Sequence, residues 1–304
     1  MKVVQFSEYG GPEVLTVAQA PMPEPAPGEV RLRLRAAAVN PADPKWRQGM
    51  FQSFAPVPFP HVPGYDVAGT IDAIGPGVEG VAVDDRVFAM LNGFTKGGYA
   101  EYAVAPASDI VAIPDELDFA TAAALPTAGL TGVQLAREHA KAEAGRRILV
   151  TGATGAVGQF ATFAAVQAGA SVIAAVRASH FDAAWALGVA EVLELGADDW
   201  EGLPFDAVID TVGGEQVSRL ARHIKPGGGV FTAATTPLDS SLIGEEPTFV
   251  VVHNDVNALA ELAQAVSAGL INISVARRLP LDDAQEAHRL IEAGGIGGKI
   301  ILEP

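Results

Sequence analysis

A glycine-spaced turn between a strand-like run and a helix-like run constrains the fold more than any other feature of this sequence. An apolar run at residues 147–151 leads into Gly152, Gly155 and Gly158, and an alanine-rich apolar stretch follows. Gly152 permits a tight turn, Gly155 lets the backbone approach a diphosphate, and Gly158 lets the new helix pack closely on the strand. The amides at the start of that helix attract an anion.

The spacing G-x-x-G-x-x-G differs from the commoner G-x-G-x-x-G, and by itself it also occurs in loops with no special role. Its position between a strand and a helix favours dinucleotide binding. We therefore expect the turn to hold the phosphates of a cofactor. The residues predicted to do so are Gly152, Thr154, Gly155, Ala156 and Val157.

The two halves of the chain have different patterns. Short strand-like runs broken by proline and glycine fill the first part, and in one of them, 31–35, arginine and leucine alternate as in a strand with one solvated face. From about residue 118, strand-like runs alternate with alanine-rich helical runs, which predicts a parallel, doubly wound sheet. We expect an α/β protein with a β-rich domain, 1–118 completed by 272–304, and a dinucleotide-binding domain, 119–271.

Composition limits the classes of partner. The 304 residues are 49% hydrophobic, and 20 basic against 36 acidic side chains give a net charge of −16. Because this charge repels phosphate backbones and anionic lipids, we expect neither nucleic acid nor membrane as a partner. The absence of cysteine excludes disulfides and thiolate zinc ligands. The longest apolar stretch, 160–176, contains Gln167 and Gly169 and predicts a helix followed by a strand. No export signal is visible, so a cytoplasmic location is expected.

The residues after the strand-like run 171–176 bear on cofactor choice. An adenosine ribose is expected there, and an acid would accept its 2′-hydroxyl in an NAD-binding protein. This chain instead has Arg177 and Ser179, followed by His180. An arginine beside a hydroxyl suits a 2′-phosphate, so NADPH is favoured, with Arg177 and Ser179 as contacts and His180 as a weaker candidate. The alternative is that Arg177 is a solvated surface charge.

Several segments resemble the zinc-independent quinone oxidoreductase branch of the medium-chain dehydrogenase/reductase superfamily, the relatives of ζ-crystallin. Besides the glycine turn they are 36–49 (AAAVNPADPKWRQG), 63–71 (PGYDVAGTI), 97–102 (GGYAEY), 125–131 (LPTAGLT) and 298–302 (GKIIL). The resemblance covers nearly the whole chain. It implies a GroES-like catalytic domain, a Rossmann domain, a cleft between them that holds NADPH, and a homodimer.

Candidate catalytic positions follow from this resemblance. Zinc-dependent cousins have a cysteine where this chain has Asn40, and a histidine and a glutamate where it has Tyr65 and Asp66, so the resemblance implies no metal site. The groups that it brings to the cleft are Asn40, Lys45 and Tyr65, and Asn40 is also a predicted cofactor contact. The alternatives are that Asn40 is a turn residue, Lys45 a solvated lysine and Tyr65 a wall of the pocket. Asp43 and Asp66 are expected to be structural, in a turn cap or a salt bridge.

Further cofactor contacts are expected at a predicted helix start and at two strand ends. They are Thr127, Asp210, Thr211, Val212, Val251 and His253, the last two within a segment whose backbone faces the nicotinamide amide in similar proteins. The His253 side chain itself is expected at the surface. The other histidines show no ligand spacing and are expected in loops or on helix surfaces: His61, His139, His180, His223 and His288.

The chemistry expected of such a cleft needs no metal. Hydride transfer to a conjugated carbonyl places negative charge on its oxygen, and preorganised hydrogen-bond donors must stabilise that charge. The sequence therefore predicts an NADPH-dependent oxidoreductase acting on a quinone or an α,β-unsaturated carbonyl. Two alternatives stay open, an enoyl reductase of a biosynthetic pathway and a non-catalytic, crystallin-like NADPH-binding protein.

Overall fold

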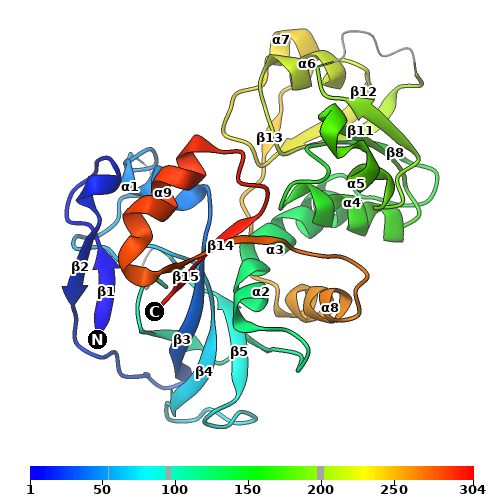
Figure 1. Ribbon diagram of the computed structural model, residues 1–304. Coiled ribbons are helices and arrows are strands. Elements are labelled where there is room, and N and C mark those ends of the chain that lie inside the picture. Colours follow the sequence, from blue (N-terminus) through cyan, green and yellow to red (C-terminus); the bar gives the residue numbers. More distant parts are fainter. Residues whose placement is uncertain (54, 94–96, 197–201) are drawn as a thin grey trace. The chain divides into compact units, whose positions relative to one another are not determined.

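The protein divides into two compact units (Figure 1). The first unit holds Met1–Thr127 and Asn254–Pro304, and the second holds Ala128–His253. The computed structural model describes residues 1–53, 55–93, 97–196 and 202–304.

Two helices belong to the first unit although the sequence placed them in a domain spanning 119–271. Helix α2 (Phe119–Ala124) packs on strand β3 (Glu29–Val39), and helix α8 (Val256–Ser267) contacts strand β7 (Ile110–Ala112). Both helices are rich in alanine, like the helices of the second unit. Composition therefore gives no sign of where the boundary falls, because only packing distinguishes the two groups.

An open sheet forms the centre of the first unit. Its strand order among the described residues is β14-β15-β3-β4-β5-β7, with β6 also paired to β3, and a separate small sheet joins β1 to β2. All pairs are antiparallel except β14 with β15. The bounds not yet given are β1 Lys2–Gln5, β2 Thr16–Gln19, α1 Ala42–Arg47, β4 Asp66–Ile74, β5 Arg86–Met90, β6 Tyr102–Pro106, β14 Val275–Pro280, α9 Ala284–Ala293 and β15 Lys299–Glu303.

Strand β3 shows the alternation predicted for residues 31–35. Leu32 and Leu34 are buried, whereas Arg33 and Arg35 are exposed. Beyond them, residues 36–39 are buried on both faces of the strand. The small side chains of this second half let β3 end inside the core, and the next residue, Asn40, is therefore buried as well.

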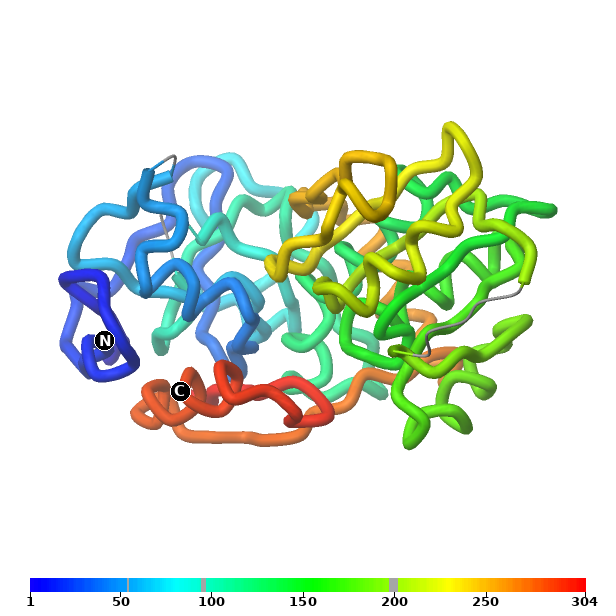
Figure 2. The backbone as a smooth tube through the Cα atoms, turned by 90° about the horizontal axis from the view of Figure 1, so that it is seen from above, coloured from blue at the N-terminus to red at the C-terminus, as the bar shows by residue number. Residues whose placement is uncertain are grey.

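The end of the chain returns to the first unit, as the sequence predicts. Strand β15 pairs with β3, where Ile301 lies opposite Ala38, and helix α9 packs against both strands. Figure 2 shows the two termini within this one unit. Residues from the two extremes of the sequence therefore share one core, in which Leu32 and Ile300 are fully buried.

A parallel sheet forms the second unit. Over the described residues its strand order is β10-β9-β8-β11-β12-β13. This is the order 3-2-1-4-5-6 of dinucleotide-binding sheets, with the reversal between β8 and β11, so the predicted Rossmann domain is confirmed. The bounds are α3 Pro126–Gln134, β8 Arg147–Thr151, α4 Gly158–Gln167, β9 Ser171–Val176, α5 Phe181–Trp185, β10 Glu191–Glu194, β11 Phe205–Asp210, α6 Glu215–Ala221, β12 Ile224–Thr232, α7 Ser240–Ile243 and β13 Thr248–Phe249.

The long apolar stretch at 160–176 is divided as predicted between helix α4 and the buried strand β9. In the part of the chain that the structure describes, no helix has the length and apolar character needed to cross a membrane.

Candidate functional site

The glycine turn joins β8 to α4 and needs its glycines for two reasons. Gly152 has a φ of 64°, in the left-handed region that side chains disfavour. A Cβ on Gly158 would lie 2.1 Å from the carbonyl oxygen of Gly152, so the helix can start here only without a side chain. The amides of Ala156 and Val157 have no backbone partner among the described hydrogen bonds. The turn thus presents donors at a helix start, as an anion requires.

Asp210, at the end of β11, uses its carboxylate to hold the residues around this turn in place. Its carboxylate accepts the hydroxyls of Thr151 and Thr232 at 2.6 Å each, and the amides of Val212 and Gly213 at 2.9 Å each. Thr211 is used in a similar way, since its hydroxyl donates to the carbonyl of Thr151 at 2.8 Å. These side chains tie three strand ends together. They also take up the amides of Thr211 and Val212, which donate to Thr151 and Asp210.

Arg177 follows β9 and belongs to a small polar cluster next to the turn. Its guanidinium lies 3.5 Å from Nε2 of His180, and Nδ1 of His180 lies 3.4 Å from the hydroxyl of Thr154. Arg177 and Ser179 are exposed. His180, the weaker candidate of the sequence, is thus the residue that joins Arg177 to the glycine turn.

Helix α3 holds the last residues of the second unit, which ends at His253. The amide of His253 donates to Gln134 at 3.1 Å, its carbonyl accepts from the same side chain at 2.8 Å, and its imidazole lies 3.1 Å from Glu138. Val251 is 76% exposed. The His253 side chain is 59% exposed and lies at the surface, as predicted, while its two bonds to Gln134 fix its backbone position.

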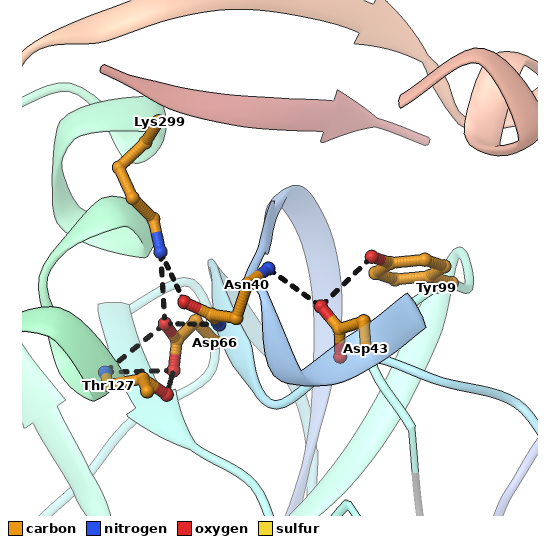
Figure 3. A network of polar contacts seen from close by, with 6 residues as sticks. All are labelled: Asn40, Asp43, Asp66, Tyr99, Thr127 and Lys299. Carbon is orange, nitrogen blue, oxygen red and sulfur yellow. Dashed lines mark hydrogen bonds and ion pairs between the residues drawn. The ribbon is translucent and has the colours of Figure 1, made fainter. Parts of the chain in front are cut away.

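A buried group of polar side chains lies in the first unit where β3 ends (Figure 3). Asn40 follows β3, Asp66 starts β4 and Lys299 starts β15. Because β3 is antiparallel to both neighbours, its end meets their beginnings. Asp43 comes from α1 and Thr127 from the first turn of α3. We call these residues, with Tyr99, the polar cluster.

Asn40 bridges two opposite charges in the polar cluster. Its Nδ2 donates to Asp66 over 2.9 Å, and its Oδ1 accepts from the ammonium of Lys299, which lies 3.8 Å from Asp66. Asp66 also accepts the amide and the hydroxyl of Thr127, at 3.1 and 2.7 Å. An ammonium only donates and a carboxylate only accepts, so these bonds fix the orientation of the Asn40 amide.

The two acids of the polar cluster are equally buried but have different partners. Burial raises the pKa of Asp43 to about 7, and the charge of Asp66 contributes in the same direction. Burial also raises the pKa of Asp66 and lowers that of Lys299, and in each case the charge of the other opposes the shift. Because the ammonium and the Thr127 donors gather on Asp66, Asp66 is the acid that stays ionised. Asp43 is the acid that takes up a proton near neutral pH.

A second line of contacts runs from Asp43 toward the surface. The Tyr99 hydroxyl lies 3.1 Å from Oδ2 of Asp43 and 3.2 Å from Nε2 of His288, whose Nδ1 lies 3.2 Å from Arg47. Arg47 in turn pairs with Glu292. A guanidinium can only donate, so Nδ1 of His288 accepts and its proton is on Nε2, which donates to Tyr99. Tyr99 then donates to Asp43.

Two candidate catalytic residues lie outside these hydrogen bonds. The half-buried ring of Tyr65 packs so closely on Gly93 that a Cβ there would lie 2.0 Å from it. Burial is the main cause that raises the pKa of the Tyr65 hydroxyl, the charge of Asp43 adds to it, and the indole N–H of Trp46 acts in the opposite direction. An indole only donates, so Trp46 leaves the Tyr65 proton for another acceptor. Lys45 is half-buried, which lowers its pKa, and no described residue pairs with its ammonium.

The polar cluster includes residues for which no functional role is predicted from the sequence. Asp43 caps the amide of Asn40 at 2.7 Å and Asp66 pairs with Lys299, which are the turn cap and the salt bridge that the sequence predicts. Tyr99 and Lys299 lie in the segments 97–102 and 298–302, which resemble the family, but neither residue is a predicted site residue. No group of three or more histidine, aspartate or glutamate side chains among the described residues is arranged to hold a metal ion.

The expectation that His288 lies in a loop or on a helix surface was wrong, because its side chain is on α9 and 0% exposed. His61 lies outside the helices and named strands, as expected, but its side chain is only 6% exposed. A signal for His288 exists in the sequence, because it follows the buried Ala284 by four residues and the buried Ala287 by one. This spacing places His288 on the inner face of α9.

Comparisons with known proteins agree over the full length of the chain. Residues 26–115 match the family described as alcohol dehydrogenase GroES-like domain, and residues 187–302 match the family described as zinc-binding dehydrogenase. A chloroplastic quinone oxidoreductase of Triphysaria versicolor is 33% identical and covers 100% of this chain and 98% of its own. An NADPH-dependent alkenal/one oxidoreductase of Arabidopsis thaliana is 31% identical, covering 100% of this chain and 80% of its own.

Solved structures with the same fold also match over the full length of the chain. A structure described as an NAD-dependent alcohol dehydrogenase has a TM-score of 0.88 at 31% identity, with 100% of both chains covered. A mycobacterial protein in complex with NADPH has a TM-score of 0.82 at 29% identity, again with 100% of both chains covered. With these similarities, the two units and the segments 36–49 and 63–71, the chain belongs to the quinone oxidoreductase branch of the medium-chain dehydrogenase/reductase superfamily and is an oxidoreductase.

Proposed function

We propose that this protein is an NADPH-dependent enzyme that reduces a quinone or an α,β-unsaturated carbonyl without zinc. The observation that carries the proposal is the make-up of the polar cluster together with Tyr65, the residue before Asp66. At positions where zinc-dependent relatives have ligands, this chain has the amide of Asn40 and the phenol of Tyr65, which are poor zinc ligands. The ammonium of Lys299 contacts Asn40 and already supplies the positive charge that Asp66 needs. A dication beside it would be repelled.

The glycine turn fits the diphosphate of a dinucleotide. The amides of Ala156 and Val157, which have no backbone partner among the described residues, are donors for it, and Gly155 leaves the approach free of a side chain. When bound, NADPH supplies a hydride from its reduced ring. Arg177 is proposed to contact the 2′-phosphate, because its guanidinium is exposed and has no acid among its described partners. Ser179 is the neighbouring hydroxyl donor.

The other proposed cofactor contacts divide into side-chain and backbone contacts. Thr154 can donate its hydroxyl beside the turn. The carboxylate of Asp210 already accepts hydrogen bonds on both oxygens, so we assign Asp210 to holding the turn. The amides of Thr211 and Val212 are also taken, so we assign these two residues to contacts through their backbone carbonyls. Val251 and His253 are likewise assigned backbone contacts, and Thr127 serves by fixing Asp66.

Tyr65 is the group that we assign to the acceptor oxygen. The indole N–H of Trp46 can act on this hydroxyl only as a donor, which leaves the phenol proton for the acceptor oxygen. Burial raises the pKa of this phenol, so it stays protonated and can stabilise an oxygen that gains negative charge. Asn40, held by Lys299 and Asp66, is assigned to positioning, and Lys45 to attracting the electron-rich carbonyl oxygen.

Two other functions remain as alternatives, the enoyl reductase and the non-catalytic NADPH-binding protein. A preference for α,β-unsaturated thioesters as substrates would favour the enoyl reductase. Tight NADPH binding with no turnover of any acceptor would favour the second. A homodimer and a cytoplasmic location remain predictions, the first testable by light scattering on the purified protein.

The experiment that tests the proposal is an acceptor screen with NADPH and with NADH. We expect oxidation of NADPH by quinones or alkenals, and no turnover of simple alcohols with the oxidised nucleotides. No reaction with any quinone or alkenal would refute the proposal, as would activity that returns only on adding zinc.

A matched pair of variants tests the role of Tyr65. Tyr65→Phe should lower kcat by about 100-fold, the effect of removing one donor to a developing oxyanion, with little change in NADPH affinity. Tyr102→Phe, in a half-buried tyrosine under Arg31, is the control and should leave kcat unchanged. Equal behaviour of the two variants would contradict the assignment.

A further inference from the structure

The two carboxylate oxygens of Asp43 have different surroundings. Oδ2 accepts the amide of Asn40 at 2.7 Å and the hydroxyl of Tyr99 at 3.1 Å. Oδ1 is equally buried, yet it has no hydrogen-bond partner in the described part of the structure. A buried oxygen without a donor is costly as part of a carboxylate and much less so as part of a neutral acid.

The line of contacts behind Tyr99 determines where a proton on Asp43 must lie. Arg47 donates to His288, His288 to Tyr99, and Tyr99 to Oδ2 of Asp43. An arginine does not give up its proton, so this line cannot reverse and cannot carry a proton to the surface. With two donors aimed at Oδ2, a proton bound to Asp43 lies on Oδ1.

The balance of charge makes Asp43 the group that takes this proton. The polar cluster holds two carboxylates, Asp43 and Asp66, and one ammonium, Lys299, which lies beside Asp66. Burial raises the pKa of Asp43 to about 7, so both forms are populated near neutral pH. The titratable or charged groups that face Asp43 from the surrounding elements are Tyr65, Asp66, Tyr99, Lys299, and, through Tyr99, His288 and Arg47.

We propose that Asp43 is the proton reservoir of the reaction and that its Oδ1 proton reaches the reduced acceptor through the hydroxyl of Tyr65. This rests on the proposed function. Hydride addition to an enone leaves an enolate, which takes one proton to become the saturated ketone. Tyr65 gives its O–H proton to the enolate, the Asp43 O–H bond breaks to restore the phenol, and Asp43 is left as a carboxylate. Water returns the proton after product leaves.

The surroundings of Tyr65 suit this relay. Its phenolate is too unfavourable to persist, because burial and the charges of Asp43 and Asp66 all raise its pKa. The phenol must therefore regain a proton as it loses one. Asp43 acts on Tyr65 electrostatically and no direct hydrogen bond joins them, so the transfer needs a bridging water or a small rotation of the hydroxyl. Tyr65 is also the more exposed of the two, so it is the route by which water recharges Asp43.

The variant Asp43→Asn tests the reservoir directly. An asparagine amide has the shape of a protonated aspartic acid, so the fold and the bonds to Asn40 and Tyr99 should persist. We expect kcat of the wild type with an enone to be constant below about pH 7 and to fall about tenfold per pH unit above it. In Asp43→Asn, kcat should be about 100-fold lower and independent of pH, with an unchanged dissociation constant for NADPH.

A second variant, Tyr99→Phe, moves the pH dependence without removing the acid. The Tyr99 hydroxyl stabilises the carboxylate form, so its loss raises the pKa of Asp43 and should shift the fall in kcat to higher pH. An unchanged pH profile in either variant would overturn the inference. If the wild type oxidises no NADPH with any acceptor, the proposed function itself fails. A wild type that is active, with Asp43→Asn equally active and equally pH-dependent, contradicts only the reservoir.

Discussion

Removing the ammonium of Lys299 should destabilise the protein by leaving the buried carboxylate of Asp66 without its counter-charge. Both groups are almost completely buried, with side-chain exposures of 5% and 0%, and 3.8 Å separates them. Breaking a buried ion pair from one side costs about 3–5 kcal/mol. Asp66 keeps its bonds to Asn40 and Thr127, so we expect Lys299→Met to lower the free energy of unfolding by about 3 kcal/mol near neutral pH.

The pH dependence of this loss has a definite sign. Without Lys299, the pKa of Asp66 in the folded state rises further above its unfolded value. Between the two values the folded state binds more protons than the unfolded state, so stability falls as pH rises through this range. The deficit of Lys299→Met should therefore be small at about pH 5 and larger at about pH 8. The measurement is urea unfolding of the wild type and the variant at both values.

A double variant separates charge from packing. In Asp66→Asn with Lys299→Met both charges are gone, and the double variant should be more stable than Lys299→Met alone. The control is Lys225→Met, which breaks a pair with Asp206 whose side chains are 44% and 22% exposed, and should cost at most about 1 kcal/mol. Additive losses in the double variant, or a Lys299→Met deficit that does not change with pH, would refute the reasoning.

Two further predictions concern the second unit. Arg177→Glu should weaken NADPH binding by about 10- to 100-fold and NADH binding much less, because a charge-assisted contact to the 2′-phosphate is lost and replaced by repulsion. Titration of the variant with both nucleotides measures the two affinities. Equal losses for NADPH and NADH would show that Arg177 does not contact the phosphate. Gly158→Ala places a Cβ 2.1 Å from the Gly152 carbonyl oxygen and should cost about 1–3 kcal/mol of stability and weaken NADPH binding. Gly155→Ala, where the same oxygen would be 3.1 Å away, is the matched control and should lose much less stability.

The features predicted best from the sequence are those that local chemistry dictates. The turn was readable because Gly152 has a conformational need and Gly158 a steric need that residues with side chains do not meet. The arginine-leucine alternation in β3 was readable because a strand has a period of two. The parallel sheet followed from alternating strand and helix patterns.

The parts that the sequence did not reveal depend on contacts between distant segments. Lys299 reaches Asn40 across 259 positions, and Arg47 reaches His288 across 241. No local sequence pattern predicts these contacts, because the partners meet only after β15 and α9 return to the first unit. The limits of the first unit were missed for the same reason, since α2 and α8 are assigned by packing.

The most direct test of the account is transfer of label from NADPH carrying deuterium on the reactive carbon of its nicotinamide. The protein would be treated with a strong chelator, mixed with the labelled cofactor and an enone, and the product analysed by mass spectrometry and NMR. The account predicts a saturated ketone with the deuterium on its β-carbon, formed at the rate of the untreated protein. A product without deuterium on that carbon, or a reaction abolished by the chelator and restored by zinc, would contradict it.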